Sequence, residues 1–132
     1  MTIFATFLVD VPEIIDLGQT AIGHRRMVPI TGGSVSGHMG DGIVLSGADW
    51  QWVQADGSIT LDAHYVIKLN SGELVEVQSN GTRFTDSTGE VVFRTSIRMN
   101  TTASRPDINQ SMFIGNGQRL ANQVILELQR VD

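Results

Sequence analysis

The chain has 132 residues, a formal net charge of −5 and no cysteine. The absence of cysteine excludes a disulfide scaffold, thiolate metal ligands and thiol redox chemistry. We expect no nucleic-acid partner, because a phosphate backbone requires a basic stripe and the one adjacent pair of basic residues is Arg25-Arg26. No apolar stretch approaches the ~18 residues of a membrane span. We therefore expect a cytoplasmic protein with a single domain over residues 1–132 and no membrane partner.

Alternation of apolar and polar residues predicts strands along almost the whole chain. Residues 2–11 are expected to form the first strand, and 11–17 could form a short helix. Further strands are predicted at 22–31, 34–45, 49–54, 58–69, 73–79, 90–99, 111–115 and 119–131. The alternation is clearest in 58–69, and we expect a buried set comprising Ile59, Leu61, Ala63, Ile67, Val124 and Leu126.

Turn signals rich in glycine separate the predicted strands. The expected turns are Ala55-Asp56-Gly57, Asn70-Ser71-Gly72, Asn80-Gly81, Ser87-Thr88-Gly89 and Gly115-Asn116-Gly117. The longer connection at 100–110 either caps a barrel mouth or is mobile. Eight to nine strands joined by tight turns indicate an all-β domain, either an up-and-down barrel or a sandwich. A closed barrel of about eight strands leaves room for side chains or one small ligand.

Asp49 is the first candidate catalytic residue, because it follows a glycine-rich segment and precedes an indole. Burial beside Trp50 would raise the pKa of this carboxyl group toward the range useful for proton transfer. The alternative is a turn-capping Asp that accepts hydrogen bonds from local N–H groups. Trp50 could stack on a planar aromatic ligand, although packing of both Trp50 and Trp52 in the core is the alternative.

Tyr65 lies on the apolar face of the 58–69 strand, where a phenol facing a cavity could donate a proton. A structural Tyr that is hydrogen-bonded to the backbone is the alternative. Asp62 and His64 lie two residues apart on the opposite face and could form an acid–base pair. That role fails if the apolar face fills the barrel, because both side chains would then face solvent.

Arg94 is the candidate for binding a substrate carboxylate through its two-pronged guanidinium group, and an exposed strand Arg is the alternative. Arg25 is a weaker candidate of the same kind. His38 is a candidate catalytic residue at the barrel rim, although a lone His is more often structural. The three histidines show no metal-ligand spacing, and the chain has neither a phosphate-binding loop nor a nucleophile elbow. We therefore expect no metal and no cofactor.

Several motifs in chain order resemble those of a bacterial and fungal family called domain of unknown function 3237. They include Gly23-His24-Arg25, Pro29-Ile30-Thr31-Gly32-Gly33, Gly47-Ala48-Asp49-Trp50-Gln51, Leu61-Asp62-Ala63-His64-Tyr65 and Phe113-Ile114-Gly115. The chain departs from the family at His64, where Arg is usual. The resemblance implies a small antiparallel, calycin-like β-barrel that often pairs into dimers. It also implies cofactor-free lyase chemistry in some relatives, such as decarboxylation with ring opening of lignin-derived phenolic compounds.

Two functions follow as hypotheses. The first is a cofactor-independent lyase, decarboxylase or isomerase that acts on an aromatic acid, with Arg94 holding the carboxylate and Asp49 or Tyr65 moving a proton. The second is a non-catalytic binding protein for a small apolar ligand, in which Asp49 and Arg94 neutralise each other. The two hypotheses differ in whether these side chains converge on one cavity. The 41% hydrophobic content also predicts a homodimer through one sheet face.

Overall fold

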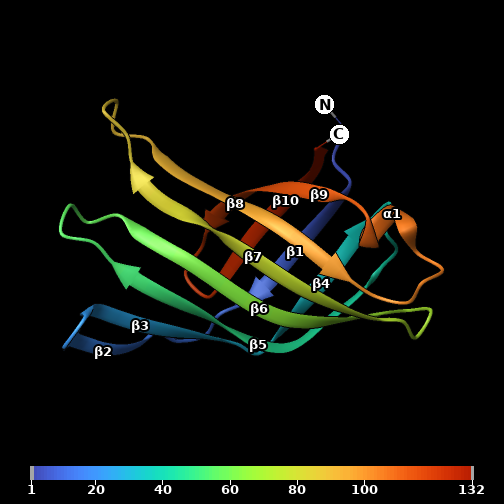
Figure 1. Cartoon of the computed structure of the whole chain (residues 1–132), viewed down its shortest axis with the longest axis horizontal. Coiled ribbons are helices and arrows are strands. Elements are labelled where there is room, and N and C mark those ends of the chain that lie inside the picture. Colours follow the sequence, from blue (N-terminus) through green and yellow to red (C-terminus); the bar gives the residue numbers. More distant parts are fainter. Residues whose placement is uncertain (1, 132) are drawn as a thin grey trace.

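The computed structural model describes residues 2–131, and it consists of ten antiparallel strands and one short helix (Figure 1). The strands and helix, in chain order, are β1 (Ala5–Asp10), β2 (Ile15–Thr20), β3 (Gly23–Ile30), β4 (Gly32–Gly37), β5 (Gly42–Val53), β6 (Ile59–Leu69), β7 (Leu74–Thr85), β8 (Val91–Asn100), α1 (Pro106–Asn109), β9 (Met112–Arg119) and β10 (Gln123–Val131). No helix among residues 2–131 is long and apolar enough to cross a membrane.

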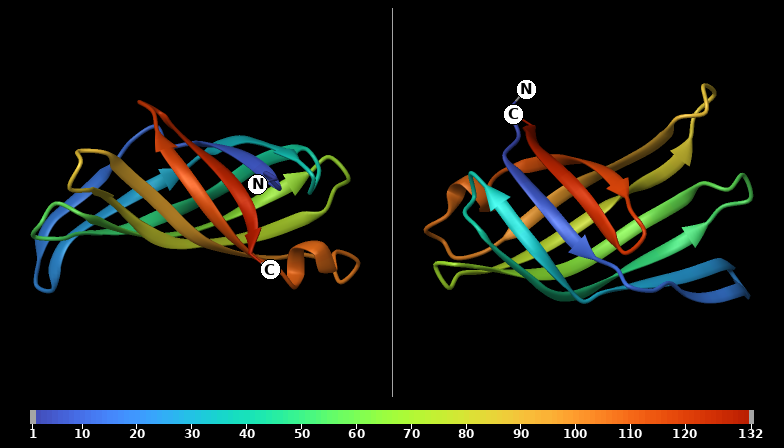
Figure 2. Two further views of the ribbon diagram at one scale, coloured as in Figure 1. Left: turned by 90° about the horizontal axis from the view of Figure 1, so that it is seen from above. Right: turned by 180° about the vertical axis from the view of Figure 1, so that it is seen from behind.

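Eight of the strands close into a barrel. Their order is β1, β4, β5, β6, β7, β8, β9 and β10, and β10 pairs with β1 to complete the circle. Strand β5 makes this closure possible because its first part pairs with β4 and its second part pairs with β3. The β2–β3 hairpin is thus added to the second half of β5 rather than to the closed circle (Figure 2). The expected closed antiparallel barrel is confirmed.

The two ends of the barrel differ in how they are filled. The end near Leu69 and Leu128, which we call the closed end, is packed with apolar side chains, and α1 adds the fully buried Ile108 to this cluster. The other end lies near Ile59 and Val124, and we call it the mouth. The β2–β3 hairpin and the β9–β10 turn both lie at this end. The segment at 100–110 thus caps the end opposite the mouth.

The predicted core residues lie inside the barrel. Ile59, Leu61, Ile67 and Leu126 are each no more than 8% exposed, and Ala63 and Val124 are partly buried against them. Inward and outward side chains alternate along each strand, so the buried positions of β6 are its odd-numbered residues. This alternation determines which candidate residues can reach the interior.

Two predicted boundaries near the N-terminal half were wrong. Residues 11–17 do not form a helix, and β2 starts at Ile15 instead. The strand predicted at 34–45 is divided between β4 and the first part of β5, and the strand predicted at 49–54 is the last part of β5, which continues through a register shift between Val44 and Ser46. A bulge of this kind bends a strand without ending it.

Two glycine motifs predicted to be turns lie within strands. Asn80-Gly81 is part of β7, and Gly115-Asn116-Gly117 is part of β9, whose turn into β10 comes later, closed by the N–H of Leu120 on the carbonyl of Gln123. Glycine is needed at 117 for close packing. A Cβ atom at this position would lie within 2.7 Å of the Phe93 ring. The absent side chain therefore leaves room for Phe93 to lie across the interior.

Candidate functional site

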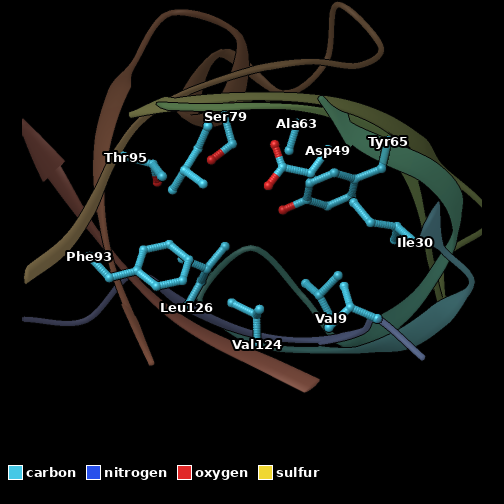
Figure 3. Close-up of a pocket in the computed structure, with 12 residues that line it drawn as sticks. Val9, Ile30, Asp49, Ala63, Tyr65, Ser79, Phe93, Thr95, Val124 and Leu126 are labelled. Atoms are coloured by element: carbon cyan, nitrogen blue, oxygen red, sulfur yellow. The ribbon is translucent and has the colours of Figure 1, made fainter. Parts of the chain in front are cut away.

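A cavity of about 40 Å³ lies inside the mouth half of the barrel (Figure 3). One wall carries oxygen-bearing side chains from β5, β6, β7 and β8, and the facing wall carries apolar side chains from β1 and β10. The lining residues are Val9, Val11, Ile30, Asp49, Leu61, Ala63, Tyr65, Ser79, Phe93, Thr95, Val124 and Leu126. The volume exceeds the ~10–15 Å³ needed for one water and is well below the ~150 Å³ of a cavity that binds benzene.

Among residues 2–131, Asp49 is the one carboxyl group that lines this cavity. Its Oδ2 accepts a hydrogen bond from Gln51 Nε2 at 2.8 Å, and its Oδ1 accepts one from the backbone N–H of Asp62 at 2.8 Å. Burial raises the pKa of the Asp49 carboxyl group, and these two hydrogen bonds oppose the increase only in part. A carboxyl group in this environment is poised to exchange a proton with a molecule in the cavity.

Two buried hydroxyl groups share the cavity with Asp49. Tyr65 and Thr95 are 2% and 4% exposed, and neither Tyr65 Oη nor Thr95 Oγ1 has a hydrogen-bond partner among the described residues. Burial and, to a smaller extent, the charge of Asp49 raise the pKa of the Tyr65 phenol. Tyr65 is therefore a neutral donor at ordinary pH. Buried hydroxyls normally find a partner, so these two are free to hydrogen-bond a polar group in the cavity.

A side-chain relay links Asp49 to the mouth. Arg26 donates to Gln51 Oε1 from Nε at 3.1 Å and from Nη2 at 2.6 Å, and Gln51 in turn donates to Asp49. Arg26 and Gln51 are directly opposed across β3 and β5, which fixes this geometry. The relay holds the Asp49 carboxyl group in one orientation without pairing it directly with a cation.

Two further arginines at the mouth occupy strand positions whose side chains face the interior of the barrel. Arg83 on β7 is opposite both the buried Ile59 and Phe93, and Arg119 on β9 is opposite Val124. Phe93 and Val124 line the cavity. Burial together with the charges of Arg83 and Arg26 lowers the pKa of Arg119, and the charge of Asp49 opposes this effect. The positive charge of Arg119 thus lies within reach of those of Arg83 and Arg26 beside the cavity, and we call these three residues the arginine cluster.

Sequence reasoning did not single out the arginine cluster, although strand parity contains the signal. Arg26 shares the parity of the buried Val28 and Ile30. Arg119 has the parity of the buried Phe113, and Arg83 has that of Val75 and Val77. The apolar members of each strand therefore mark these arginines as inward.

The expected substrate clamp Arg94 does not reach the cavity. It is exposed on the outer face of β8, whereas its neighbours Phe93 and Thr95 face inward. Asp62 and His64 also lie outside the barrel, where Asp62 Oδ1 accepts from Asn80 and His64 Nε2 lies 2.7 Å from Glu76 Oε2. The alternation of β6 explains this placement, because its odd-numbered residues fill the interior.

The remaining candidates also lie away from the cavity. Trp50 is 40% exposed on the outer face of β5, and the Arg25 guanidinium lies 5.0 Å from the centre of its ring and 4.1 Å from that of Trp52. The expected packing of both indoles in the core is therefore wrong as well. His38 is exposed at the closed end, where its ring lies 5.3 Å from that of Phe4. Of the predicted site residues, the cavity brings together Asp49 and Tyr65.

No group of three or more carboxylate or imidazole side chains that could hold a metal ion occurs among residues 2–131. The groups that can act chemically are instead one carboxyl group, two free hydroxyls and the arginine cluster. They can transfer a proton, donate a hydrogen bond and bind an anion, respectively.

Comparisons with known proteins agree with the fold and identify the family. The family model described as "Protein of unknown function (DUF3237)" matches residues 1–131. A UPF0311 protein from Rhodopseudomonas palustris is 32% identical over 143 residues, covering 96% of this chain and 92% of the relative. The crystal structure of a β-barrel-like protein from Acinetobacter baumannii superimposes with a TM-score of 0.92 and 28% identity, over 98% of this chain and 94% of that one.

A more distant likeness extends to a fungal protein. The crystal structure of an enzyme from Penicillium herquei covers 97% of this chain and 92% of its own, with a TM-score of 0.76 and 17% identity. At that identity, the likeness establishes a shared fold alone. Taken with the match over residues 1–131 and the 32% identical relative, the closed barrel places this chain in the DUF3237 family.

Proposed function

We propose that the protein is a cofactor-independent acid–base enzyme, a lyase, decarboxylase or isomerase, that acts on a small aromatic acid bound at the mouth of the barrel. Asp49 moves the proton, and the Tyr65 hydroxyl donates a hydrogen bond to the oxygen on which charge develops. The observation that carries this proposal is the burial of a carboxyl group with a raised pKa beside two hydroxyls without partners.

The asymmetry of the cavity supports a planar substrate. Oxygen-bearing side chains occupy one wall, and Val9, Val124 and Leu126 occupy the other (Figure 3). A flat molecule between these walls would meet an apolar surface on one face and the proton-transfer groups on the other. Its edge would contact the ring of Phe93, which lies at the side of the cavity.

Cavity size limits how such a substrate binds. Because the enclosed volume is about 40 Å³, an aromatic ring does not fit wholly inside it. The ring must therefore extend toward the mouth or widen it on entry. A substrate held this way places its reacting atoms near Asp49 and leaves its other end at the rim.

A binding protein for a small apolar ligand is the second candidate, and the hydrogen bonding of Asp49 favours it. Both carboxylate oxygens of Asp49 already accept hydrogen bonds within the protein. In this case, Asp49 anchors β5 to β6 and exchanges no proton with a ligand. The two candidates give opposite results for removal of the ionisable group.

Replacement of Asp49 by Asn tests the proposal. With a panel of hydroxylated benzoic and cinnamic acids, NMR in D2O detects both product formation and deuterium incorporation into the ring or side chain. We expect Asp49→Asn to lower turnover by at least ~10²-fold, the lower range for loss of a general acid or base, while the barrel stays folded. Asp41→Asn, an exposed change at the closed end, is the matched control and should leave turnover unchanged. Equal turnover in the two variants would remove Asp49 from the mechanism, and binding of these acids without turnover by the wild type would favour the binding protein.

A further inference from the structure

We propose that the arginine cluster is a carboxylate-binding site, and that it orients a ligand whose apolar body enters the cavity while its anionic group stays at the mouth. The inference rests on the proposed function, because it names the chemical class of ligand for the same cavity. It assigns to Arg26, Arg83 and Arg119 the role that the sequence suggested for Arg94.

The first argument is the lack of internal compensation for these charges. Among residues 2–131, neither Arg83 nor Arg119 has a carboxylate oxygen within 4.0 Å. Arg26 donates to the neutral amide of Gln51. The nearby Asp49 is held by Gln51 and by a backbone N–H, and Asp16, directly opposite Arg26 on β2, is held by His24 and by the backbone N–H of Gly18. Arg83 and Arg119 therefore have no ion pair among residues 2–131, and the two carboxylates near Arg26 are each engaged by other groups.

Arg105, which has a structural role, shows by comparison how an arginine is neutralised within this protein. Arg105, at the closed end, donates to Glu73 Oε1 at 3.1 Å, to Asp107 Oδ2 at 3.0 Å and to the backbone carbonyl of Met39 at 2.9 Å. Its charge is thus matched by two carboxylates. Like charges that are brought together and partly desolvated raise the free energy of the folded state unless a counter-charge arrives. The arginine cluster at the mouth is therefore suited to bind an anion as its counter-charge.

The second argument is the junction between the cluster and the apolar cavity. Arg83 is directly opposite Phe93, and Arg119 is directly opposite Val124, across neighbouring strands. Both apolar residues line the cavity. Opposed residues on adjacent strands have their Cβ atoms about 5 Å apart, so an anion at the guanidinium groups lies next to an apolar surface. This juxtaposition matches an amphipathic anion rather than a free inorganic one.

The geometry also relates the bound anion to Asp49. The relay from Arg26 through Gln51 ends on Asp49, so one end of the cluster is tied to the proton-transfer group. A carboxylate held at the mouth leaves the ring or chain that bears it in the cavity, beside Asp49 and Tyr65. The cluster would thereby select which atoms of the ligand face the acid–base groups.

Benzoate and its neutral analogue benzamide test the site directly, because they differ chiefly in charge. Calorimetry or ligand-detected NMR on the wild-type protein should show that benzoate binds at least about tenfold more tightly than benzamide. In the variants Arg83→Met and Arg119→Met, the ratio of the affinity for benzoate to that for benzamide should fall toward one. Arg94→Met removes an arginine from the outer face of a neighbouring strand and should keep the ratio. A ratio near one in the wild-type protein, or its loss in Arg94→Met, would overturn the proposal.

Two further measurements separate carboxylate binding from phosphate binding and from a loss of folding. Inorganic phosphate should displace benzoate poorly, and displacement at equal concentration would instead assign the cluster to phosphate. Arg119→Met should unfold at the same temperature as the wild type or higher, because it removes a like charge that is partly desolvated. A loss of benzoate binding in this variant therefore does not come from unfolding, and a lower unfolding temperature would contradict the uncompensated cluster.

The anion site and the enzyme can fail separately. Asp49→Asn should keep or strengthen the preference for benzoate, since the change removes a negative charge near the cluster, even though it lowers turnover. If no acid in the panel is turned over but benzoate is preferred, the anion site stands without the enzyme. If turnover depends on Asp49 but benzoate and benzamide bind equally tightly, the proposed enzyme is supported and the proposed anion site is wrong.

Discussion

Among single residues, Asp49 links the stability of the barrel to pH. Its folded-state pKa lies above the ordinary value of 3.8, so the folded protein binds its proton more tightly than the unfolded chain does. Between 3.8 and the raised pKa, the folded state holds more protons, and stability therefore falls as pH rises through this window. Four hydrogen-bonded surface carboxylates have lowered pKa values, and their contribution to stability increases as pH rises. They are Asp16, Glu73, Glu76 and Asp86.

Comparison of the wild type with Asp49→Asn isolates this contribution, because the surface carboxylates cancel in the difference. We predict that the free energy of unfolding of the wild type, minus that of Asp49→Asn, decreases between about pH 4 and pH 7. Urea titrations of both proteins at each pH measure this difference in unfolding free energy. A difference that stays constant or increases would mean that burial does not raise the pKa of Asp49.

At this scale, the sequence predicted part of the site. Tyr65 was placed correctly because it shares the apolar face of its strand, whereas Asp49 was chosen for its glycine-rich approach and its neighbour Trp50, which lies on the opposite, outer face. Arg94 was placed wrongly because a strand sends adjacent residues to opposite faces, so an error of one residue moves a side chain from the cavity to solvent. The cluster of Arg26, Arg83 and Arg119 comes from β3, β7 and β9, and its convergence depends on barrel closure, which no single segment encodes.

Among the elements, α1 owes its position at the closed end to Arg105. This side chain joins the helix residue Asp107, the β6–β7 turn through Glu73 and the backbone carbonyl of Met39, a residue that is 1% exposed. We predict that Arg105→Met lowers the free energy of unfolding by about 1–3 kcal/mol, because hydrogen bonds to charged groups are lost and a buried carbonyl is left without its donor.

Arg98→Met is the matched control for this change, since Arg98 is exposed on the outer face of β8. It should change stability by less than about 0.5 kcal/mol in denaturant titrations. If both variants lose the same amount, then the Arg105 network does not hold the closed end together.

Element existence was easier to predict than element boundaries. The alternation along 58–69 matched β6 to within one residue at its start, because both faces of this strand have a consistent polarity. The motifs around Gly81 and Gly117 were wrongly predicted to be turns, because glycine occurs in strands for a second reason. It permits turns, and it also permits close packing against a neighbouring strand, which the pattern of one segment does not distinguish.

At the scale of the whole molecule, β2 ends the sheet and pairs with β3 alone. Its exposed apolar side chains include Leu17 at 49% and Ile15 at 40%, with Ile22 at 82% in the following turn. An exposed apolar strand edge is a template for pairing with another chain. We predict that two copies associate through β2, giving a light-scattering mass near twice 14.4 kDa at micromolar concentration.

Leu17→Lys should return this mass to that of a single chain, because a charge on an edge strand opposes pairing. Val91→Lys is the control, since Val91 is 66% exposed on a strand that is paired on both sides within the barrel. A mass near 14.4 kDa for the wild type would exclude the dimer at that concentration.

The arginine cluster has a kinetic consequence in a protein whose formal net charge is −5. An approaching organic anion is repelled by the molecule as a whole and attracted only near the mouth. Salt at about 0.1 M limits these fields to ~10 Å, so it removes the long-range repulsion first and leaves the contacts with partly desolvated guanidinium groups less affected. Association should therefore become faster with moderate salt while the residence time changes little, the reverse of the usual behaviour of an electrostatically steered complex.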